Sequence, residues 1–190
     1  MARNVFIIHG TAGSPEGNWF PWLKKELEAI GCRVFVPRFP TPEGQSLENW
    51  LKTFKEYERF LDEESILVGH SLGPSFILNV LERLSYPVKA AFLVSGFTGK
   101  LGNKEFDPLI ESFSDRTFDW NKIRNNCRNF FVYNSDDDPY VPIEKGKFIA
   151  EKLGAKLSII KNGGHLNAEF GYLKFEQLLN DIKKLLKGID

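Results

Sequence analysis

Short apolar runs alternate with segments of helical period along nearly the whole chain. Most of the runs are continuously apolar, which is typical of strands covered on both faces of a sheet. Strands that alternate with helices are joined by right-handed crossovers, which makes neighbouring strands parallel. The pattern predicts an α/β fold, a three-layer α/β/α sandwich with about six mainly parallel strands. The expected strands are Asn4–Ile8, Arg33–Val36, Ile66–Gly69, Val88–Val94, Asn129–Tyr133 and Lys156–Ile160.

Four segments have the apolar spacing of amphipathic helices. They are residues 20–30, 47–57, 77–84 and 175–186. Ser46 is the expected N-cap of the second helix, because its hydroxyl can accept a bond from a free backbone N–H. Residues 98–116 have the weakest period, so we expect them to pass over the top of the sheet and not to mark a domain boundary.

The length and composition favour one domain and exclude several classes of protein. The 190 residues suit a single compact domain, residues 1–190, whose core needs no disulfide or metal. Lys+Arg and Asp+Glu are 25 each, so the formal net charge is zero, and we expect no nucleic-acid partner and no membrane partner. Hydrophobic residues make up 42%, a share that argues against a disordered chain.

The cysteines and the N-terminal residues favour a cytoplasmic location. Cys32 and Cys127 are too few for a disulfide scaffold and form no Cys-x-x-Cys pattern. One bridge between them is the alternative to two free thiols, which we favour. The first apolar run, Val5–Ile8, is shorter than the region of about 7 to 15 residues in a signal peptide, or the about 20 of a membrane helix.

The segment Gly69-His70-Ser71-Leu72-Gly73 follows the third expected strand and precedes a helix. This is a G-x-S-x-G pattern in the strand, turn and helix context of a nucleophile elbow. A serine on such a sharp turn has strained backbone angles, so its neighbours two positions away need to lack side chains. The helix that follows directs its first N–H groups at developing negative charge. We predict that Ser71 is a nucleophile; the alternative is a chance match in an ordinary turn.

Three histidines compete for the role of general base, which a serine nucleophile needs at neutral pH. The side chain of His70 should point away from the Ser71 oxygen. His9 lies in a glycine-containing loop that more often shapes an oxyanion hole. His165 lies after the last expected strand, in a loop that can bring its imidazole to Ser71. We predict that His165 is the base; the alternative is a solvent-exposed loop histidine.

The acid that orients this histidine is expected in the run Asp136-Asp137-Asp138, which follows the fifth expected strand. We favour Asp138, because Asp-Pro-x-Val-Pro resembles the acid turn of many hydrolases, and Asp136 is the second choice. A solvated turn or a hard-cation site is the alternative, but no second acidic cluster accompanies the run, and we expect no metal. The chain order serine, aspartate, histidine is that of this architecture, with each residue after the carboxyl end of a strand.

Backbone N–H groups are expected to form an oxyanion hole. One should come from Leu72, the residue after the nucleophile. The second should come from the loop after the first strand, in our interpretation from Thr11, with Gly10 and Ala12 as alternatives. Each such donor typically lowers the barrier by about 3 kcal/mol.

Aromatic residues lie near the same end of the expected sheet. Trp19, Phe97 and Tyr140 are candidates for the walls of a small substrate pocket. Each of them is individually more typical of core or cap packing. Together they make an apolar pocket plausible, and the short chain leaves no span for a large lid.

Taken together, these segments make the chain resemble an α/β-hydrolase, in particular the small serine-hydrolase family that includes retinoblastoma-binding protein 9. The resemblance covers nearly the whole length. It implies a six-stranded sheet with little cap, a triad carried over as Ser71, Asp138 and His165, and hydrolysis of small esters or amides without a cofactor. The segments that carry it are Trp19–Leu27, Gly69–Gly73, Trp120–Ile123, Asp137–Pro139, and Gly164-His165 with Glu169-Phe170.

The expected function is hydrolysis of small carboxylic esters through an acyl-enzyme on Ser71. The alternatives are an amidase or aminopeptidase-like hydrolase, and a protein-binding module that kept the hydrolase fold. Pocket-protein recognition uses Leu-x-Cys-x-Glu, whereas the segment before the elbow, Arg59–Glu63, lacks the leucine and cysteine at their positions. We therefore expect no pocket-protein partner. The sequence does not separate esters from amides or identify the acyl group.

Overall fold

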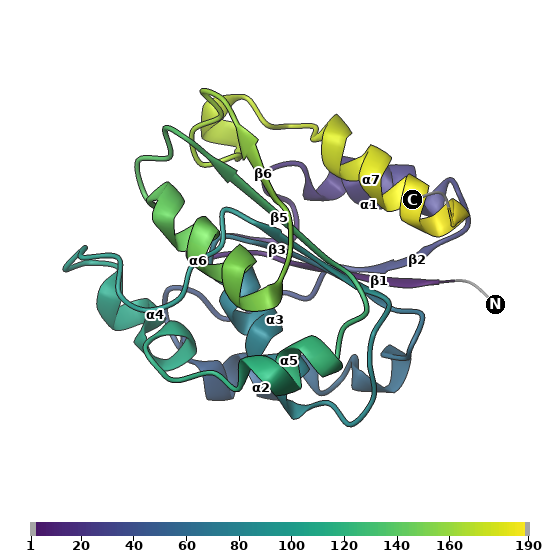
Figure 1. Ribbon diagram of the computed structural model, residues 1–190, viewed down its shortest axis with the longest axis horizontal. Coiled ribbons are helices and arrows are strands. Elements are labelled where there is room, and N and C mark those ends of the chain that lie inside the picture. The colour runs from purple at the N-terminus through teal and green to yellow at the C-terminus, as the bar shows by residue number, and fades with distance from the viewer. Residues whose placement is uncertain (1–2, 189–190) are drawn as a thin grey trace.

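Six parallel strands form one sheet in the order β2-β1-β3-β4-β5-β6 (Figure 1). The computed structural model describes residues 3–188. The chain moves outward from β1 to β2, then crosses back to β3 and continues in the other direction. The loops after β1 and β3 therefore lie at the switch point, where sheets of this kind bind ligands. The strands are β1 (Asn4–Ile8), β2 (Arg33–Phe35), β3 (Ile66–His70), β4 (Ala90–Val94), β5 (Phe130–Ser135) and β6 (Leu157–Ile160).

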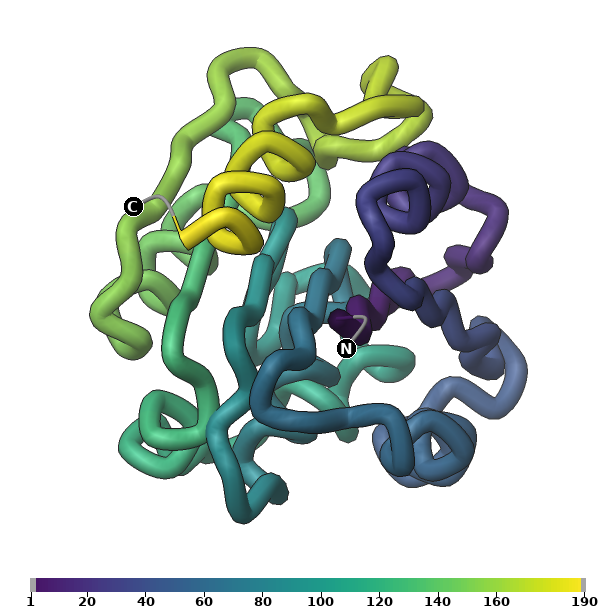
Figure 2. Tube along the Cα trace, turned by 90° about the vertical axis from the view of Figure 1, so that its right-hand side faces the viewer, coloured from purple at the N-terminus to yellow at the C-terminus, as the bar shows by residue number. Residues whose placement is uncertain are grey.

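Helices cover both faces of the sheet (Figures 1 and 2). Alternate residues of each strand belong to different cores: in β1, Val5 and Ile7 pack toward α1 and α7, whereas Phe6 and Ile8 pack toward the other helices. This is the three-layer sandwich predicted from the sequence. The helices on the first face are α1 (Phe20–Glu28) and α7 (Glu176–Lys187). Those on the second face are α2 (Leu47–Phe54), α3 (Leu72–Arg83), α4 (Asp107–Ser114), α5 (Trp120–Asn125) and α6 (Ile143–Leu153).

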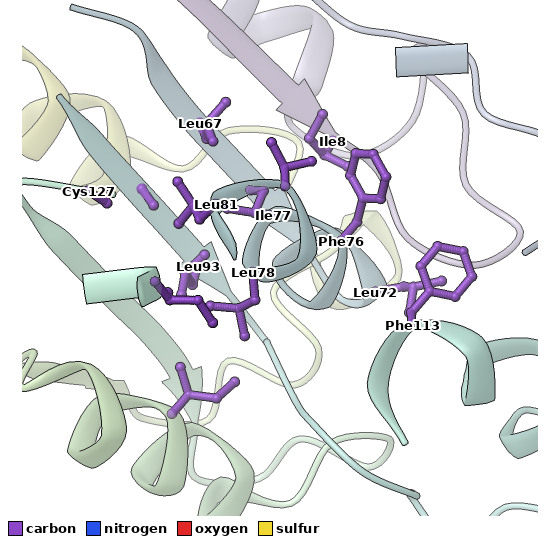
Figure 3. Packing of buried hydrophobic residues seen from close by; sticks show 14 of the residues in the cluster. Ile8, Leu67, Leu72, Phe76, Ile77, Leu78, Leu81, Leu93, Phe113 and Cys127 are labelled. Atoms are coloured by element: carbon purple, nitrogen blue, oxygen red, sulfur yellow. The ribbon is translucent and has the colours of Figure 1, made fainter. Parts of the chain in front are cut away.

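Helix α3 runs through the centre of the larger core (Figure 3). Every residue from Leu72 to Leu81 is buried. Its side chains Phe76, Ile77 and Leu81 lie in the same apolar cluster as strand residues such as Leu67. A helix buried on all sides has little freedom to shift, because protein interiors are close-packed. It therefore makes a rigid support for the residue that precedes it, Ser71.

The segment that the sequence left without a period contains a helix. Residues 98–116 were expected only as an excursion, but they include α4, which packs on α3. Because α4 rests on another helix and has only eight residues, it lacks the long sheet-facing stripe that reveals a helix in a sequence. Helices α5 and α6 were not predicted either. Ser46 caps α2 as expected, accepting a bond of 3.2 Å from Asn49 N–H.

Both cysteines are free, as favoured from the sequence. Cys127 is buried in the core, and this burial raises the pKa of its thiol to about 12. Cys32 is half-buried, and burial raises its pKa as well. Neither thiol is therefore a reactive thiolate at neutral pH. Among residues 3–188, no helix has the length and apolar character needed to cross a bilayer.

Candidate active site

Ser71 lies on a strained turn between β3 and α3. Its φ and ψ are 60° and −106°, values that a residue with a side chain adopts only when its surroundings enforce them. The N–H of Ser71 donates to the carbonyl oxygen of Val94 over 2.9 Å, which continues the pairing of β3 with β4. The buried helix on one side and the sheet on the other therefore hold the turn that the sequence pattern predicts.

Three glycines leave space for this turn. A Cβ on Gly73 would overlap the carbonyl oxygen of Ile8, and one on Gly69 would lie 2.7 Å from the backbone of Gly73. A Cβ on Gly10, in the loop after β1, would lie 2.7 Å from the Cβ of Ser71. Such contacts are too short for real atoms. The glycines at the two ends of the motif are thus required by backbone packing.

Asp138 and His165 form a buried hydrogen-bonded pair. The Nδ1–H of His165 donates to Oδ2 of Asp138 over 2.8 Å, and the two side chains are 8% and 1% exposed. The other carboxylate oxygen accepts the backbone N–H groups of Tyr140 and Val141, at 2.9 and 3.0 Å. With Nδ1 protonated, Nε2 of the neutral ring is left as the basic nitrogen.

The neighbouring aspartates hold the backbone of the histidine loop, residues 162–168. Asp136 accepts the N–H of Asn162 over 2.9 Å, and Asp137 accepts the N–H of Gly164 over 2.8 Å. The bonds of Asp137 to Ser135 and Gly164 lower the pKa of its carboxyl group. The three consecutive carboxylates thus bind three different groups of one loop. Asp136, the second choice for the acid, does not contact the His165 ring, and no metal-ligand cluster occurs within residues 3–188.

The backbone carbonyl of His165 accepts hydrogen bonds from two side chains at the ends of β3 and β4. Nε2–H of His70 donates to it over 2.8 Å, and the hydroxyl of Ser95 donates over 3.2 Å. Burial, with a smaller contribution from the nearby His165 ring, lowers the pKa of His70 to about 3. His70 is therefore neutral at physiological pH and acts as a donor. Its side chain is directed toward the histidine loop and is not hydrogen-bonded to Ser71 within residues 3–188.

The loop after β1 directs one N–H group away from the core. The carbonyl oxygen of Gly10 accepts bonds from His9 Nδ1–H, at 2.8 Å, and from Gly13 N–H, at 3.1 Å. Since the N–H of a trans peptide points opposite to its carbonyl, the N–H of Thr11 faces the other way. The N–H of Ala12 is already bonded to Thr41 Oγ1 at 2.7 Å. The backbone N–H of Ala12, one of the two alternatives, is thus occupied, whereas the N–H of Thr11, the favoured candidate, is free of acceptors within residues 3–188.

Leu72 supplies the second free N–H. It is the first residue of α3, and the first N–H groups of a helix have no acceptor within the helix. Neither Thr11 N–H nor Leu72 N–H has a hydrogen-bond acceptor within residues 3–188. Burial lowers the pKa of His9, so its ring remains a neutral support beneath this loop. The two N–H groups expected to form an oxyanion hole are both unoccupied.

Ser71 and His165 lie between two cavities. An apolar cavity of about 220 Å³ lies on one side, and a more polar one of about 250 Å³ on the other. Ser71 Oγ and the His165 ring are not hydrogen-bonded to each other within residues 3–188; in hydrolytic sites this bond often tightens only in the complex with substrate. The apolar cavity is lined by Phe97, Leu101, Phe106, Ile110, Tyr140 and Val141. The polar one is lined by the loop after β1, Asn18 and Asn167.

Two of the three predicted pocket residues line the apolar cavity. Phe97 and Tyr140 do so, and the Tyr140 hydroxyl donates to Glu169 Oε2 over 3.0 Å at the rim. The prediction for Trp19 is corrected: it is fully buried and does not line either cavity beside Ser71. Its Nε1–H donates to Leu166 O over 3.0 Å, so it supports the histidine loop from the core.

Sequence reasoning missed several residues of the site because no local pattern marks them. Ser95 and Gln45 contact the site through hydrogen bonds to residues distant in sequence, His165 and Thr11 respectively. The cavity wall contributed by Phe106 and Ile110 comes from the N-cap and the body of α4, a helix that the sequence did not predict. Only Glu169 had a signal, since it follows His165 closely and was part of the family resemblance.

Comparison with known proteins identifies the class. The sequence profile of the family described as Serine hydrolase matches residues 5–184. The crystal structure of the ydeN gene product of Bacillus subtilis has a TM-score of 0.91 and 33% identity, covering 98% of this chain and 100% of that one. Est1E of Butyrivibrio proteoclasticus, at a TM-score of 0.76 and 17% identity over 98% of this chain and 89% of that one, shares the fold. The fold is that of the α/β-hydrolases.

Two relatives match over most of their length. YdeN of Bacillus subtilis (strain 168), whose name classes it as a hydrolase, is 36% identical over 174 residues, 90% of each chain. The Rattus norvegicus protein named Serine hydrolase RBBP9 is 31% identical over 183 residues, 95% of this chain and 94% of that protein. The chain belongs to the serine hydrolase family that includes RBBP9, and it is a hydrolase, which confirms the family and the enzyme class predicted from the sequence.

Proposed function

We propose that this serine hydrolase cleaves small carboxylic esters through an acyl-enzyme on Ser71, with Asp138 and His165 completing a triad. One observation carries the proposal. The buried 2.8 Å bond from His165 to Asp138 leaves the free ring nitrogen in the same cavity as a serine held on a strained elbow. This is the arrangement of nucleophile, base and orienting acid that acyl transfer requires.

The first half of the reaction acylates the serine. The Ser71 oxygen attacks the ester carbonyl carbon while His165 Nε2 takes the hydroxyl proton. The N–H groups of Thr11 and Leu72 stabilise the negative charge on the carbonyl oxygen, and Asp138 stabilises the imidazolium. His165 then returns the proton to the leaving alkoxide, the ester C–O bond breaks, and an alcohol departs.

The second half releases the acid. Water attacks the acyl-serine carbonyl, His165 accepts its proton, and the same two N–H groups hold the second tetrahedral intermediate. Collapse returns the proton to Ser71 and frees a carboxylic acid. No step calls for a cofactor.

The two cavities suit a substrate with unlike halves. The apolar cavity of about 220 Å³ contains no lysine or arginine, so a neutral apolar group fits it better than an anion. The cavity on the other side has a more polar lining, which includes Ser14, Asn18 and Asn167 and suits a polar group. Both volumes limit the substrate to a small molecule. We keep the aminopeptidase-like alternative as a comparison, because the Glu169 carboxylate at the rim could accept a protonated amine.

A fluorophosphonate probe and a panel of substrates test the proposal. We expect the wild type to be labelled and to hydrolyse short-chain p-nitrophenyl esters, and Ser71→Ala to do neither. Asp138→Asn should lower kcat about 10⁴-fold, because it disturbs the tautomer of the base. Aminoacyl amides and thioesters in the same panel compare the alternatives. Equal labelling of wild type and Ser71→Ala, or an inert wild type, would contradict the proposal.

The sequence-based expectations on partners and location remain proposals. We propose that the protein binds no pocket protein through residues 59–63; Leu61 is only 7% exposed, so its side chain is not available for such a contact. We also propose a cytoplasmic location, in keeping with two free thiols. A pull-down with a pocket protein and cell fractionation test these two statements.

A further inference from the structure

The side-chain amide of Gln45 joins two parts of the site that are distant in sequence. Gln45 is half-buried and lies two residues before α2. Its Nε2 donates to Thr11 Oγ1 over 3.1 Å and to the backbone carbonyl of Leu109, in α4, over 2.7 Å. The amide orientation is determined by its partners, because a backbone carbonyl can only accept and so must face the NH₂ group.

The same amide is connected to the N–H groups of the loop after β1, residues 9–13, which we call the oxyanion loop. Its Oε1 accepts the Thr41 hydroxyl, and Thr41 Oγ1 in turn accepts the Ala12 N–H over 2.7 Å. Ala12 has a φ of 55°, which a residue with a Cβ adopts only when it is held there. The network thus withdraws the Ala12 N–H from the site and leaves Thr11 N–H open.

The other end of the amide reaches the wall of the apolar cavity. Leu109 lies beside Ile110 in α4, and Ile110 and Phe106 line that cavity. A second bond, from Leu47 N–H to Ser112 Oγ at 3.0 Å, ties α4 to the start of α2. A substrate in the apolar cavity therefore contacts α4, and α4 is connected to the oxyanion loop through Gln45.

We propose that Gln45 is a positioning residue that sets the Thr11 N–H donor and connects its position to α4. The inference rests on the proposed ester hydrolysis, because it assigns Thr11 N–H to the oxyanion. Gln45 itself touches neither the substrate nor the reacting atoms. Its bond to Thr11 Oγ1 holds the loop that does, and its bond to Leu109 O fixes the amide on α4. Without these two bonds the loop is free to turn its N–H away from the developing charge.

The decisive variant is Gln45→Glu. It keeps the shape and the acceptor for Thr41, but its carboxylate cannot donate to Leu109 O, and it can meet Thr11 Oγ1 only by accepting the Thr11 hydroxyl, which reverses that bond. Asn49→Ala is the matched control, because the Asn49 amide also holds a carbonyl in this segment, that of Gly44, without reaching the oxyanion loop. Wild type, both variants and Gln45→Ala are compared on an ester and on its thiono analogue, whose sulfur is a poor hydrogen-bond acceptor.

For Gln45→Glu we expect kcat for the carbonyl ester to fall about 30-fold, with KM nearly unchanged. Removing one oxyanion donor lowers kcat by about 10²- to 10³-fold, and here the donor is displaced and not removed. The thiono ester should lose much less, so the carbonyl-to-thiono preference narrows. Asn49→Ala should keep the wild-type preference. Equal losses on both substrates, or wild-type rates in Gln45→Glu, would overturn the inference.

A measurement without turnover separates this inference from the proposed function. In ¹⁵N–¹H spectra, Gln45→Glu should shift the Thr11 amide resonance and speed its hydrogen exchange, while Asn49→Ala leaves both as in wild type. If the wild type is inert toward esters but the Thr11 resonance moves, the reaction assigned to the site is wrong and the positioning role stands. An unmoved Thr11 resonance refutes the positioning role in either case.

Discussion

The elbow and the histidine loop meet at the same cavities but are built in different ways. The elbow, residues 69–73, is held by backbone packing: β3 precedes it, a fully buried helix follows it, and its glycines touch neighbouring backbone. The histidine loop, residues 162–168, lies between β6 and a short 3₁₀ turn and is held by hydrogen bonds from side chains elsewhere in the chain. One half of the site is fixed by shape and the other by polar contacts.

This difference predicts how each half fails. An error in the elbow disturbs the centre of the larger core, so it should appear as lost stability. An error in the contacts of the histidine loop moves one ring by a small distance, so it should appear mainly as lost kcat. A displacement of about 1 Å can cost about 100-fold in rate.

The largest effect is expected from Gly73→Ala. The added Cβ would overlap the Ile8 carbonyl oxygen, and neither the buried helix nor the sheet can give way. We expect the free energy of unfolding, measured in urea, to fall by about 4 kcal/mol or more. Gly154→Ala is the control, since no atom lies within 4 Å of the added Cβ and the change costs only the strain of a positive φ, of 65°. It should lose only about 1–2 kcal/mol, and similar losses in both variants would contradict the packing argument.

His70→Ala should give the next largest effect, and it should appear in the rate. Removing the imidazole takes away the 2.8 Å bond to the His165 carbonyl, which leaves Ser95 as its remaining donor. We expect kcat for an ester to fall about 100-fold. His70→Gln, which restores an N–H donor, should recover part of the loss, and Ser95→Ala should lose less than His70→Ala. A wild-type kcat in His70→Ala would show that the loop does not depend on this contact.

His70 also makes the stability depend on pH. Its folded pKa of about 3 lies below the ordinary value of about 6.5, so between these values the unfolded chain binds a proton that the native protein does not. The contribution is fully present above about pH 6.5 and is lost as pH falls toward 3, with a slope of at most about 1.4 kcal/mol per pH unit. Urea unfolding from pH 7 to pH 4 should show a smaller slope in His70→Gln than in wild type. An unchanged slope would contradict a buried neutral His70.

The smallest effect is expected from the carboxylates beside the acid. Asp137→Ala removes the acceptor for Gly164 N–H, one residue before His165, and should lower kcat about tenfold. Asp136→Ala removes the acceptor for the N–H of Asn162, the first residue of the loop, which is farther from His165. It should therefore lower kcat less. Steady-state kinetics at neutral pH measures both. The reverse order would mean that the loop is held mainly at its first residue.

The same difference explains what the sequence could reveal. The elbow was predicted because its determinants are contiguous: a strand, a motif of five residues, and a helix. Asp138 was preferred over Asp136 because of the turn that follows it, and the structure pairs Asp138 with His165. Ser95 and Gln45 carry no such mark, because a single long-range hydrogen bond leaves no pattern in a sequence. The pocket prediction for Trp19 was wrong because a large aromatic side chain near a site can face the core or a pocket, and only the fold shows which.

The position of Ser71 between two cavities has a consequence for the order of events in a catalytic cycle. In the mechanism that we propose, an acyl group bound in the apolar cavity leaves the polar cavity to the departing alcohol, and the next nucleophile enters by the same path. Water is one such nucleophile, and a second alcohol is another. In this proposed mechanism, the molecule that occupies the polar cavity therefore decides between hydrolysis and transfer of the acyl group.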